Sequence, residues 1–357
     1  MNRILVIEPY FGGSHRQFLL GLQQNIDAEF VFLTLSARKW KMKMQLSAPW
    51  FADCVSKMEN QKFDTVLCST FVDVAVLQAL LNRLKGWNEK CLYCTYYHEN
   101  QFAYPTRLED KTIYQFTSIN YNTALVSDRL AFNSQYNLHT FLAGCRRYLK
   151  KCTDFDLRHT TEQIEEKSSV LYPGINFDQT PGLTKDTSDV PVICWNHRWE
   201  HDKNPEQFFS SLEELDKKGY PFKLVILGQS FRDEPPIFHW AQKRFAAQLL
   251  QFGYVSCREE YVSWLKKSDI VVSTALHEFF GISVMEAVGA GCIPLVPDRL
   301  SYPELYPSYF RYQDGELSRK LGDILTGFMK DNLPSVDIDL SRFGWNALKQ
   351  SYSKWLL

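Results

Sequence analysis

The sequence has no apolar run long enough to cross a membrane, no excess charge of either sign and no internal repeat. Its longest apolar stretch, residues 66–81, is interrupted by Asp73 and Gln78, whereas a transmembrane helix needs about 20 apolar residues. The 40 Lys and Arg balance 41 Asp and Glu, so any nucleic acid must be held by a local basic patch. We therefore expect a cytoplasmic protein that does not use a membrane, and the oligomeric state stays open.

The cysteines also show no spacing typical of disulfide-rich or zinc-binding proteins. The chain has nine cysteines, an odd number scattered along its length, and no secretory signal, which indicates reduced thiols. Cys91 and Cys94 have C-x-x-C spacing, but no second pair lies at zinc-ribbon distance. Their neighbours form strands, which would point the two thiols to opposite faces of a sheet. We expect no metal or redox centre at this pair.

What the sequence does contain is an alternation of short apolar segments with amphipathic ones, over 357 residues, a length typical of two domains. The expected strands are 4–8, 29–34, 65–70, 92–97, 130–133, 169–172, 190–195, 223–228, 252–255, 270–274 and 293–296. The expected helices include 16–24, 73–83, 205–218, 237–251, 259–267 and 281–290. This pattern predicts an α/β fold with doubly wound parallel sheets, covered by helices on both faces.

The alternation pauses between residues 178 and 189, where the chain is polar and rich in Pro, Gly and Thr. We read this stretch as a linker that separates a domain at 1–178 from a second domain at 189–339. Ligands of doubly wound sheets bind beyond the carboxyl ends of the strands. The loops that follow strands, facing a central cleft, are therefore the expected binding site.

Two such loops belong to the first domain. Gly12 and Gly13 allow close approach of the backbone to a ligand and precede a helix whose N–H groups suit an anion, although a tight turn explains them equally well. His98 follows the strand 92–97 together with Glu99 and Asn100. We interpret His98 as a hydrogen-bond partner or proton carrier, with a capped helix start as the alternative.

A third loop, in the second domain, carries cations. Arg198 and Lys203 lie just before a helix that Asn204 can cap and that Pro205 can begin. Two cations beside a helix N-terminus form a pocket for a pyrophosphate. The alternative is a solvated loop of surface ion pairs.

The fourth loop carries two glutamates, Glu278 and Glu286, at the start of a helix. The helix N-terminus favours phosphate, while carboxylates offer several acceptor lone pairs to the hydroxyls of a sugar and a ribose. Taken alone, Glu286 is also explained as an exposed helix glutamate. The combination favours a binding site.

These motifs resemble those of retaining glycosyltransferases of the GT-B fold, in the large GT4-like group. The resemblance rests on Arg198 with Lys203, on Glu278 with Glu286, on residues 172–176 and on residues 343–345. More narrowly, the chain resembles the tRNA-queuosine alpha-mannosyltransferase family in residues 12–15, 97–101, 132–134, 197–203 and 277–281. The resemblance implies two Rossmann-like domains facing a central cleft, with residues 340–357 packing back on the first.

The family resemblance also implies a donor and an acceptor. The donor is GDP-mannose, and the acceptor is a hydroxyl of the queuosine cyclopentenediol in a tRNA anticodon. Arg198 and Lys203 would neutralise the pyrophosphate, Glu286 would bind the ribose, and Glu278 would bind the mannose. His98 would lie near the anomeric carbon.

The remaining implied contacts come from backbone. Gly12 and Gly13 would let the first domain close over the donor. Residues Phe279, Phe280 and Gly281 would form the helix tip that holds phosphate, and the backbone around Tyr254 and Val255 would form the base pocket.

No metal is expected, because Arg, Lys and a helix dipole can neutralise phosphate charge. Two D-x-D strings, 154–156 and 337–339, follow no clear sheet strand. No carboxylate stands out as an inverting base. We therefore expect retention through a front-face ion pair.

A tRNA acceptor requires local positive charge. Lys39, Lys41 and Lys43 with Trp40 interleave cations and an aromatic ring, a pattern suited to RNA backbone and base contacts. A second basic run lies at 146–151. Such runs also occur as solvated loops.

Three other functions fit the same motifs. One is a GT-B enzyme acting on a lipid or polysaccharide, and helix 16–24, with one Arg and no Lys, argues mildly against it. Another is a binding protein that holds a nucleotide sugar without transfer. The third is a nucleotide-sugar epimerase, which needs no acceptor.

Overall fold

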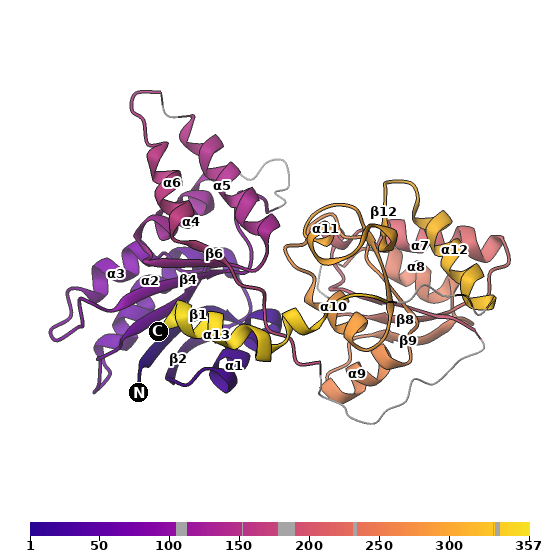
Figure 1. The fold of residues 1–357 in the computed structure, drawn as a ribbon, viewed down its shortest axis with the longest axis horizontal. Helices are drawn as coiled ribbons and strands as arrows, with labels where there is room; N and C mark the ends of the chain where they lie inside the picture. The colour runs from indigo at the N-terminus through magenta and orange to yellow at the C-terminus, as the bar shows by residue number, and fades with distance from the viewer. Residues whose placement is uncertain (105–112, 152, 178–189, 231–233, 331, 333–335) are drawn as a thin grey trace. The chain divides into compact units, whose positions relative to one another are not determined.

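The chain forms two compact units in a computed structural model, Met1–Gly174 with Ser341–Leu357, and Ile175–Leu340 (Figure 1). The structure describes residues 1–104, 113–151, 153–177, 190–230, 234–330, 332 and 336–357. The predicted linker at 178–189 lies outside these ranges. None of the helices in them is long and apolar enough to cross a membrane.

The first unit is built on a six-stranded sheet in the order β2-β1-β3-β4-β5-β6, with every neighbouring pair parallel. Its strands are β1 (Arg3–Phe11), β2 (Glu29–Ser36), β3 (Thr65–Ser69), β4 (Leu92–Tyr97), β5 (Arg129–Phe132) and β6 (Ser168–Val170). Ile4 and Val6 enter one core cluster while Leu5 and Ile7 enter another, because successive strand residues point to opposite faces. A strand that is apolar on both sides needs helices on both sides.

Those helices are α1 (Gly13–Asn25), α2 (Trp40–Ser56), α3 (Val74–Leu81), α4 (Ile113–Val126), α5 (Gln135–Leu149), α6 (His159–Glu166) and α13 (Trp345–Leu356), the last preceded by the turn η3 (Ser341–Phe343). The helix α13 lies beside α1 (Figure 1), and its Trp345 and Tyr352 share a core cluster with Phe18 of α1. The Tyr352 hydroxyl donates to the Tyr172 carbonyl at 2.7 Å. The chain therefore returns to its first unit after completing the second.

The second unit has a parallel sheet in the order β12-β11-β10-β7-β8-β9. Its strands are β7 (Val192–Asn196), β8 (Lys223–Leu227), β9 (Leu249–Gly253), β10 (Ile270–Val272), β11 (Ile293–Pro297) and β12 (Arg311–Tyr312). Its helices and turns are η1 (His201–Lys203), α7 (Pro205–Lys217), α8 (Ile237–Arg244), α9 (Arg258–Lys266), α10 (Ile282–Gly289), α11 (Tyr302–Leu305), η2 (Ser308–Phe310) and α12 (Leu317–Met329). The predicted α/β fold class is confirmed.

Two local predictions are wrong. The predicted helix 237–251 ends at Arg244, and the strand predicted at 252–255 is instead β9, Leu249–Gly253. Pairing of Leu249 with Leu224 of β8 overrides the weak helix preference of this segment. Residues 40–56, for which the sequence analysis gave no helix, form the helix α2.

Candidate active site

Lys203 is the most enclosed cation of the predicted site. It ends the turn η1, just beyond the carboxyl end of β7, and its side chain is 7% exposed. Its ammonium group donates to the His277 carbonyl at 2.7 Å and lies 3.3 Å from both Glu278 Oε2 and Asp202 Oδ2. Three acceptors match the three donors of an ammonium group, so Lys203 is fixed in place.

Glu278 stays ionised beside this cation. Its burial disfavours the charge, but Lys203, with His197 and His277 nearby, holds the pKa of Glu278 at about 2. The side chain is 21% exposed, so the carboxylate retains access to a ligand. An ionised, anchored carboxylate of this kind can accept hydroxyl donors from a sugar.

The sequence analysis did not assign a role to His197, which the structure places in the same cluster. Burial and the charge of Lys203 lower the pKa of His197 to about 4, so the ring is neutral at pH 7. Its Nε2 is buried and has no hydrogen-bond partner within the described residues. The sequence feature that could have identified His197 is its position between the buried strand residue Trp195 and the predicted cation Arg198.

Arg198 pairs with a different carboxylate from those that hold Lys203. Its guanidinium pairs with Glu200 at 3.0 Å, and its side chain is 47% exposed. The next residue, Trp199, is buried and stacks on Phe238 with ring centroids 4.1 Å apart. Trp199 therefore anchors the loop, while Arg198 remains accessible to a ligand.

Glu286 is held by partners that the sequence analysis missed. Arg258, the first residue of α9, donates to Glu286 Oε1 at 2.6 Å, and the Tyr261 hydroxyl donates to Oε2 at 3.3 Å. Asn196 at the end of β7 donates to the Tyr261 hydroxyl at 3.2 Å and to the Ser283 carbonyl at 2.7 Å. No local motif links Arg258 to Glu286, because tertiary packing alone brings α9 beside α10.

The loop before α10 turns at Gly281, whose φ of 88° lies in the left-handed region that favours glycine. Phe279 and Phe280 are buried, so only their backbone remains for the predicted phosphate contact. Tyr254 and Val255 follow β9, and the Tyr254 side chain is 65% exposed. These two residues lie beyond a carboxyl strand end, as the predicted base pocket requires.

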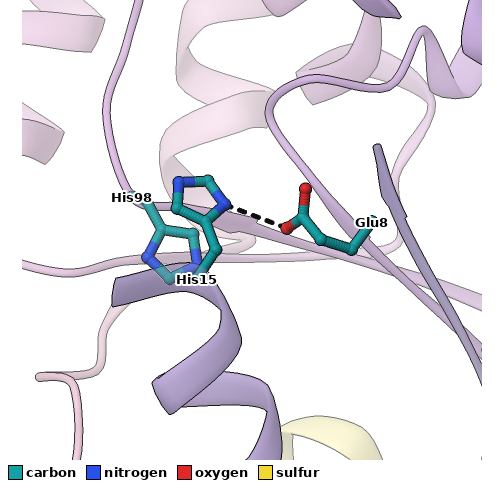
Figure 2. A group of neighbouring side chains, drawn as sticks. All are labelled: Glu8, His15 and His98. Carbon is teal, nitrogen blue, oxygen red and sulfur yellow. Dashed lines mark hydrogen bonds and ion pairs between the residues drawn. The ribbon is translucent and has the colours of Figure 1, made fainter. Parts of the chain in front are cut away.

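In the first unit, His98 belongs to a polar cluster with the buried Glu8 and His15 (Figure 2) and with the partly buried Glu99. His15 Nδ1 lies 2.9 Å from Glu8 Oε2, and its Nε2 lies 3.4 Å from Glu99 Oε2. The rings of His15 and His98 stack with centroids 4.0 Å apart. The sequence analysis treated Glu8 only as a strand end and gave His15 no role of its own.

The two histidines differ in charge. Although burial disfavours a charged ring, Glu8 and Glu99 raise the pKa of His15 to about 10. Burial and the neighbouring His15 charge lower the pKa of His98 well below its ordinary value. The cluster is thus one imidazolium between two carboxylates, with a neutral imidazole stacked against it.

Glu8, His15 and His98 are also the one group of potential metal ligands close enough to share an ion in the described part of the chain, with ligand atoms within 4.8 Å of one another. Metal-binding imidazoles direct ring nitrogens at the ion. Here the rings are stacked, 28° from parallel, and His15 uses both nitrogens on carboxylates. This geometry fits an ion-pair network better than a metal centre.

Glycine is required at positions 12 and 13 for different structural reasons. A Cβ on Gly12 would lie 2.5 Å from the Ala37 Cβ, so Gly12 permits close packing of the loop after β1 against the loop after β2. Gly13 has a φ of 51° and open space around the Cβ position. The predicted close approach of a ligand therefore concerns Gly13 rather than Gly12.

The predicted RNA patch begins next to this loop. Lys39 has a left-handed φ of 54° and precedes α2. Lys39 and Lys41 are exposed, whereas Lys43 is partly buried and donates to the Ser36 carbonyl. Trp40 packs against Phe71, Tyr104 and Phe116, at centroid distances of 5.7, 5.7 and 5.3 Å. The stacking role expected for Trp40 is thus largely taken by the protein's own core.

Comparison with known proteins identifies the family of the chain. Residues 3–175 match the family model for the tRNA-queuosine alpha-mannosyltransferase N-terminal region, and residues 183–317 match that for glycosyl transferases group 1. The tRNA-queuosine alpha-mannosyltransferase of Drosophila melanogaster is 36% identical over 329 residues, covering 89% of this chain and 85% of the fly protein.

Solved structures agree on the fold. Anabaena HepE in complex with UDP has a TM-score of 0.66 at 13% identity and covers 99% of each chain. The apo form of the lipopolysaccharide outer core galactosyltransferase WaaB has a TM-score of 0.62 at 13% identity, covering 99% of this chain and 98% of WaaB. Both predictions, of fold and of family, are confirmed: the chain is a GT-B glycosyltransferase that belongs to the tRNA-queuosine alpha-mannosyltransferase family.

Proposed function

We propose that this enzyme transfers mannose from GDP-mannose to the cyclopentenediol of queuosine in a tRNA anticodon, with retention of the anomeric configuration and without a metal. The observation that carries the proposal is the fixed Lys203–Glu278 pair, 3.3 Å apart, at the carboxyl edge of the second sheet. It puts a cation for phosphate next to an ionised acceptor for sugar hydroxyls. A cytoplasmic site of action follows from a tRNA acceptor.

Lys203 and Arg198 would share the pyrophosphate. Lys203 is desolvated and gives a strong, fixed charge, while the more exposed Arg198 can rotate from Glu200 onto an incoming phosphate. The backbone at Phe280 and Gly281, where α10 begins, adds N–H donors. Together these groups stabilise the leaving diphosphate in place of a divalent cation.

The two glutamates would bind the hydroxyls of different sugars in the donor. Glu286, oriented by Arg258 and Tyr261, would accept from the ribose, and Glu278 would accept from the mannose. Tyr254 and Val255 would border the base. His98 would serve the mannosyl group as a neutral hydrogen-bond partner, because its low pKa leaves one donor and one acceptor nitrogen.

Retention follows from where the carboxylates are engaged. Glu278 and Glu286 each pair with a cation and are assigned to binding. In a front-face ion pair, the bond from the anomeric carbon to phosphate oxygen breaks first. The same phosphate oxygen then takes the proton of the acceptor hydroxyl as the new glycosidic bond forms. NMR of the product nucleoside should show the alpha linkage of the donor.

The deciding experiment incubates the enzyme with GDP-mannose and with tRNA that carries or lacks queuosine, followed by nucleoside mass spectrometry. We expect a hexose on queuosine alone. UDP-glucose as a parallel donor tests the sugar and the base. Mannose on tRNA lacking queuosine, or transfer from UDP-glucose only, would overturn the proposal.

Glu278→Gln tests the central assignment. The amide keeps the shape but loses the charge that accepts sugar hydroxyls, so transfer should fall at least 100-fold, about 2.7 kcal/mol of transition-state stabilisation. Affinity for GDP should change less than threefold, because GDP lacks the sugar. Glu213→Gln, at an exposed ion pair on α7, is the matched control and should retain full activity.

A further inference from the structure

The His15 side chain lies between two carboxylates, one from the strand β1 and one from the loop after β4. Glu8 ends the regular pairing of β1, and Glu99 follows β4, and both face ring nitrogens of His15 at 2.9 and 3.4 Å. A neutral imidazole has one N–H and donates to only one of them. Donation to both requires the imidazolium form.

Both carboxylates are themselves fixed as acceptors. Glu8 Oε1 accepts from the Tyr10 backbone N–H at 2.7 Å and from the Ser69 hydroxyl at 3.1 Å. Glu99 Oε1 accepts from the Thr70 hydroxyl at 3.0 Å. Each glutamate thus keeps its other oxygen directed at His15. Hydrogen bonds therefore hold both carboxylates in the orientation in which they face the His15 ring.

His98 lies directly against this cation (Figure 2). The two rings are 28° from parallel with centroids 4.0 Å apart, and the exposure of His98 is only 7%. A second proton on His98 would place two positive rings in van der Waals contact, away from water, which is strongly unfavourable. Tyr96 and Phe18 contact the His98 ring edge-on at 4.6 and 5.0 Å and fix its plane.

We propose that His15 is a positioning residue, a fixed positive charge against the His98 ring that keeps His98 neutral and oriented during transfer. The idea rests on the proposed function, in which His98 meets the mannosyl group. It also gives His98 a definite chemistry. His98 acts as a hydrogen-bond donor and acceptor throughout the physiological pH range, and never as an imidazolium acid.

The charge assignment is tested first without substrate. In full-length protein with ¹⁵N-labelled histidine, the ring nitrogens of His15 should show imidazolium shifts from pH 6 to 8.5, while those of His98 should show the neutral form at every pH in that range. Spectra of His15→Gln and His98→Asn assign the two signals. A neutral His15 at pH 7 overturns the proposal, whether or not the enzyme transfers mannose.

The second test is the pH dependence of kcat with GDP-mannose and queuosine tRNA. After His15→Gln, the groups facing His98 would be Glu8 and Glu99 without their cation, so the pKa of His98 should rise from its present low position, although burial still opposes the charged ring. The variant should then lose activity as the pH falls from 8 to 5.5, with an inflection that the wild type does not show. Identical profiles would overturn the positioning role.

Phe71→Leu is the matched control. Phe71 also stacks on His15, with centroids 5.4 Å apart, but carries no charge. Its loss should lower stability without shifting the pH profile. If His15→Gln fails to fold, Glu99→Gln is measured in its place, because it removes one of the two carboxylates beside His15 and keeps Glu8. The spectra of histidine in the wild-type protein still decide whether His15 is charged. If the wild-type enzyme has an imidazolium at His15 but transfers no mannose, the proposed function is refuted and the charge assignment of His15 stands.

Discussion

Glu278 and Glu286 pair with different kinds of cation. Glu278 faces a nearly buried lysine, whereas Glu286 faces an arginine whose side chain is 34% exposed. The sequence analysis selected both glutamates and Lys203, since Lys203 and Glu278 lie in loops after strands and Glu286 lies in the helix that follows the second of these loops. It could not predict Arg258, because the residues from 258 to 286 come together only when α9 and α10 pack.

Arg258→Met tests whether this unpredicted residue matters for the donor. Without the 2.6 Å contact, the Glu286 carboxylate loses the charge-assisted hydrogen bond that orients it. Such a bond contributes about 1.5 kcal/mol, so the Kd for GDP measured by titration calorimetry should rise roughly tenfold. Arg244→Met removes a similarly exposed pair with Asp216, also at 2.6 Å, and should leave GDP binding unchanged. Equal affinities in the two variants would contradict the assignment.

The helices show where the sequence pattern is informative. Asn204 and Pro205 predicted the start of α7, and Asn204 does accept from the Gln207 N–H as its cap. The helix α2 was missed, because its core face begins at Met44 and its first turn reads as a basic run. Local cap chemistry is visible in sequence, whereas a helix defined by its packing partners is not.

The contact between α1 and α13 is tight enough to require glycine. A Cβ at Gly21 would lie 2.3 Å from Cζ2 of Trp345. Gly21→Ala should therefore destabilise the protein by about 1–3 kcal/mol through overpacking, despite the better helix propensity of alanine. Denaturant unfolding measures the change. Gln23→Ala, exposed on the same helix, should stay within about 0.5 kcal/mol of wild type. An equally stable Gly21→Ala would mean that Trp345 moves freely.

At the scale of the whole molecule, the alternating strands and helices predicted both sheets, because parallel strands buried on two faces leave a strong apolar signal. Net charge carried no such signal. With −1 overall, binding of a polyanion depends on where the cations lie, and the exposed Lys39 and Lys41 lie where β2 ends and α2 begins.

Lys39→Glu combined with Lys41→Glu should weaken tRNA binding and reduce its dependence on salt. Each lost phosphate contact lowers the slope of log K against log salt by a little under one, so the slope should fall by roughly 1–2. Filter binding across a salt series measures it. Lys217→Glu with Lys218→Glu on α7 makes the same change in net charge and is the control. Equal slopes in both double variants would remove the predicted patch from the acceptor site.

The return of α13 to the first unit has a consequence for biosynthesis. The helix that covers Phe18 and Leu22 is synthesised only after the entire second unit. Until then the nascent N-terminal sheet keeps an uncovered apolar flank, a surface on which chaperones act. A truncation that removes α13, Trp345–Leu356, would thus damage the part of the enzyme that was made first.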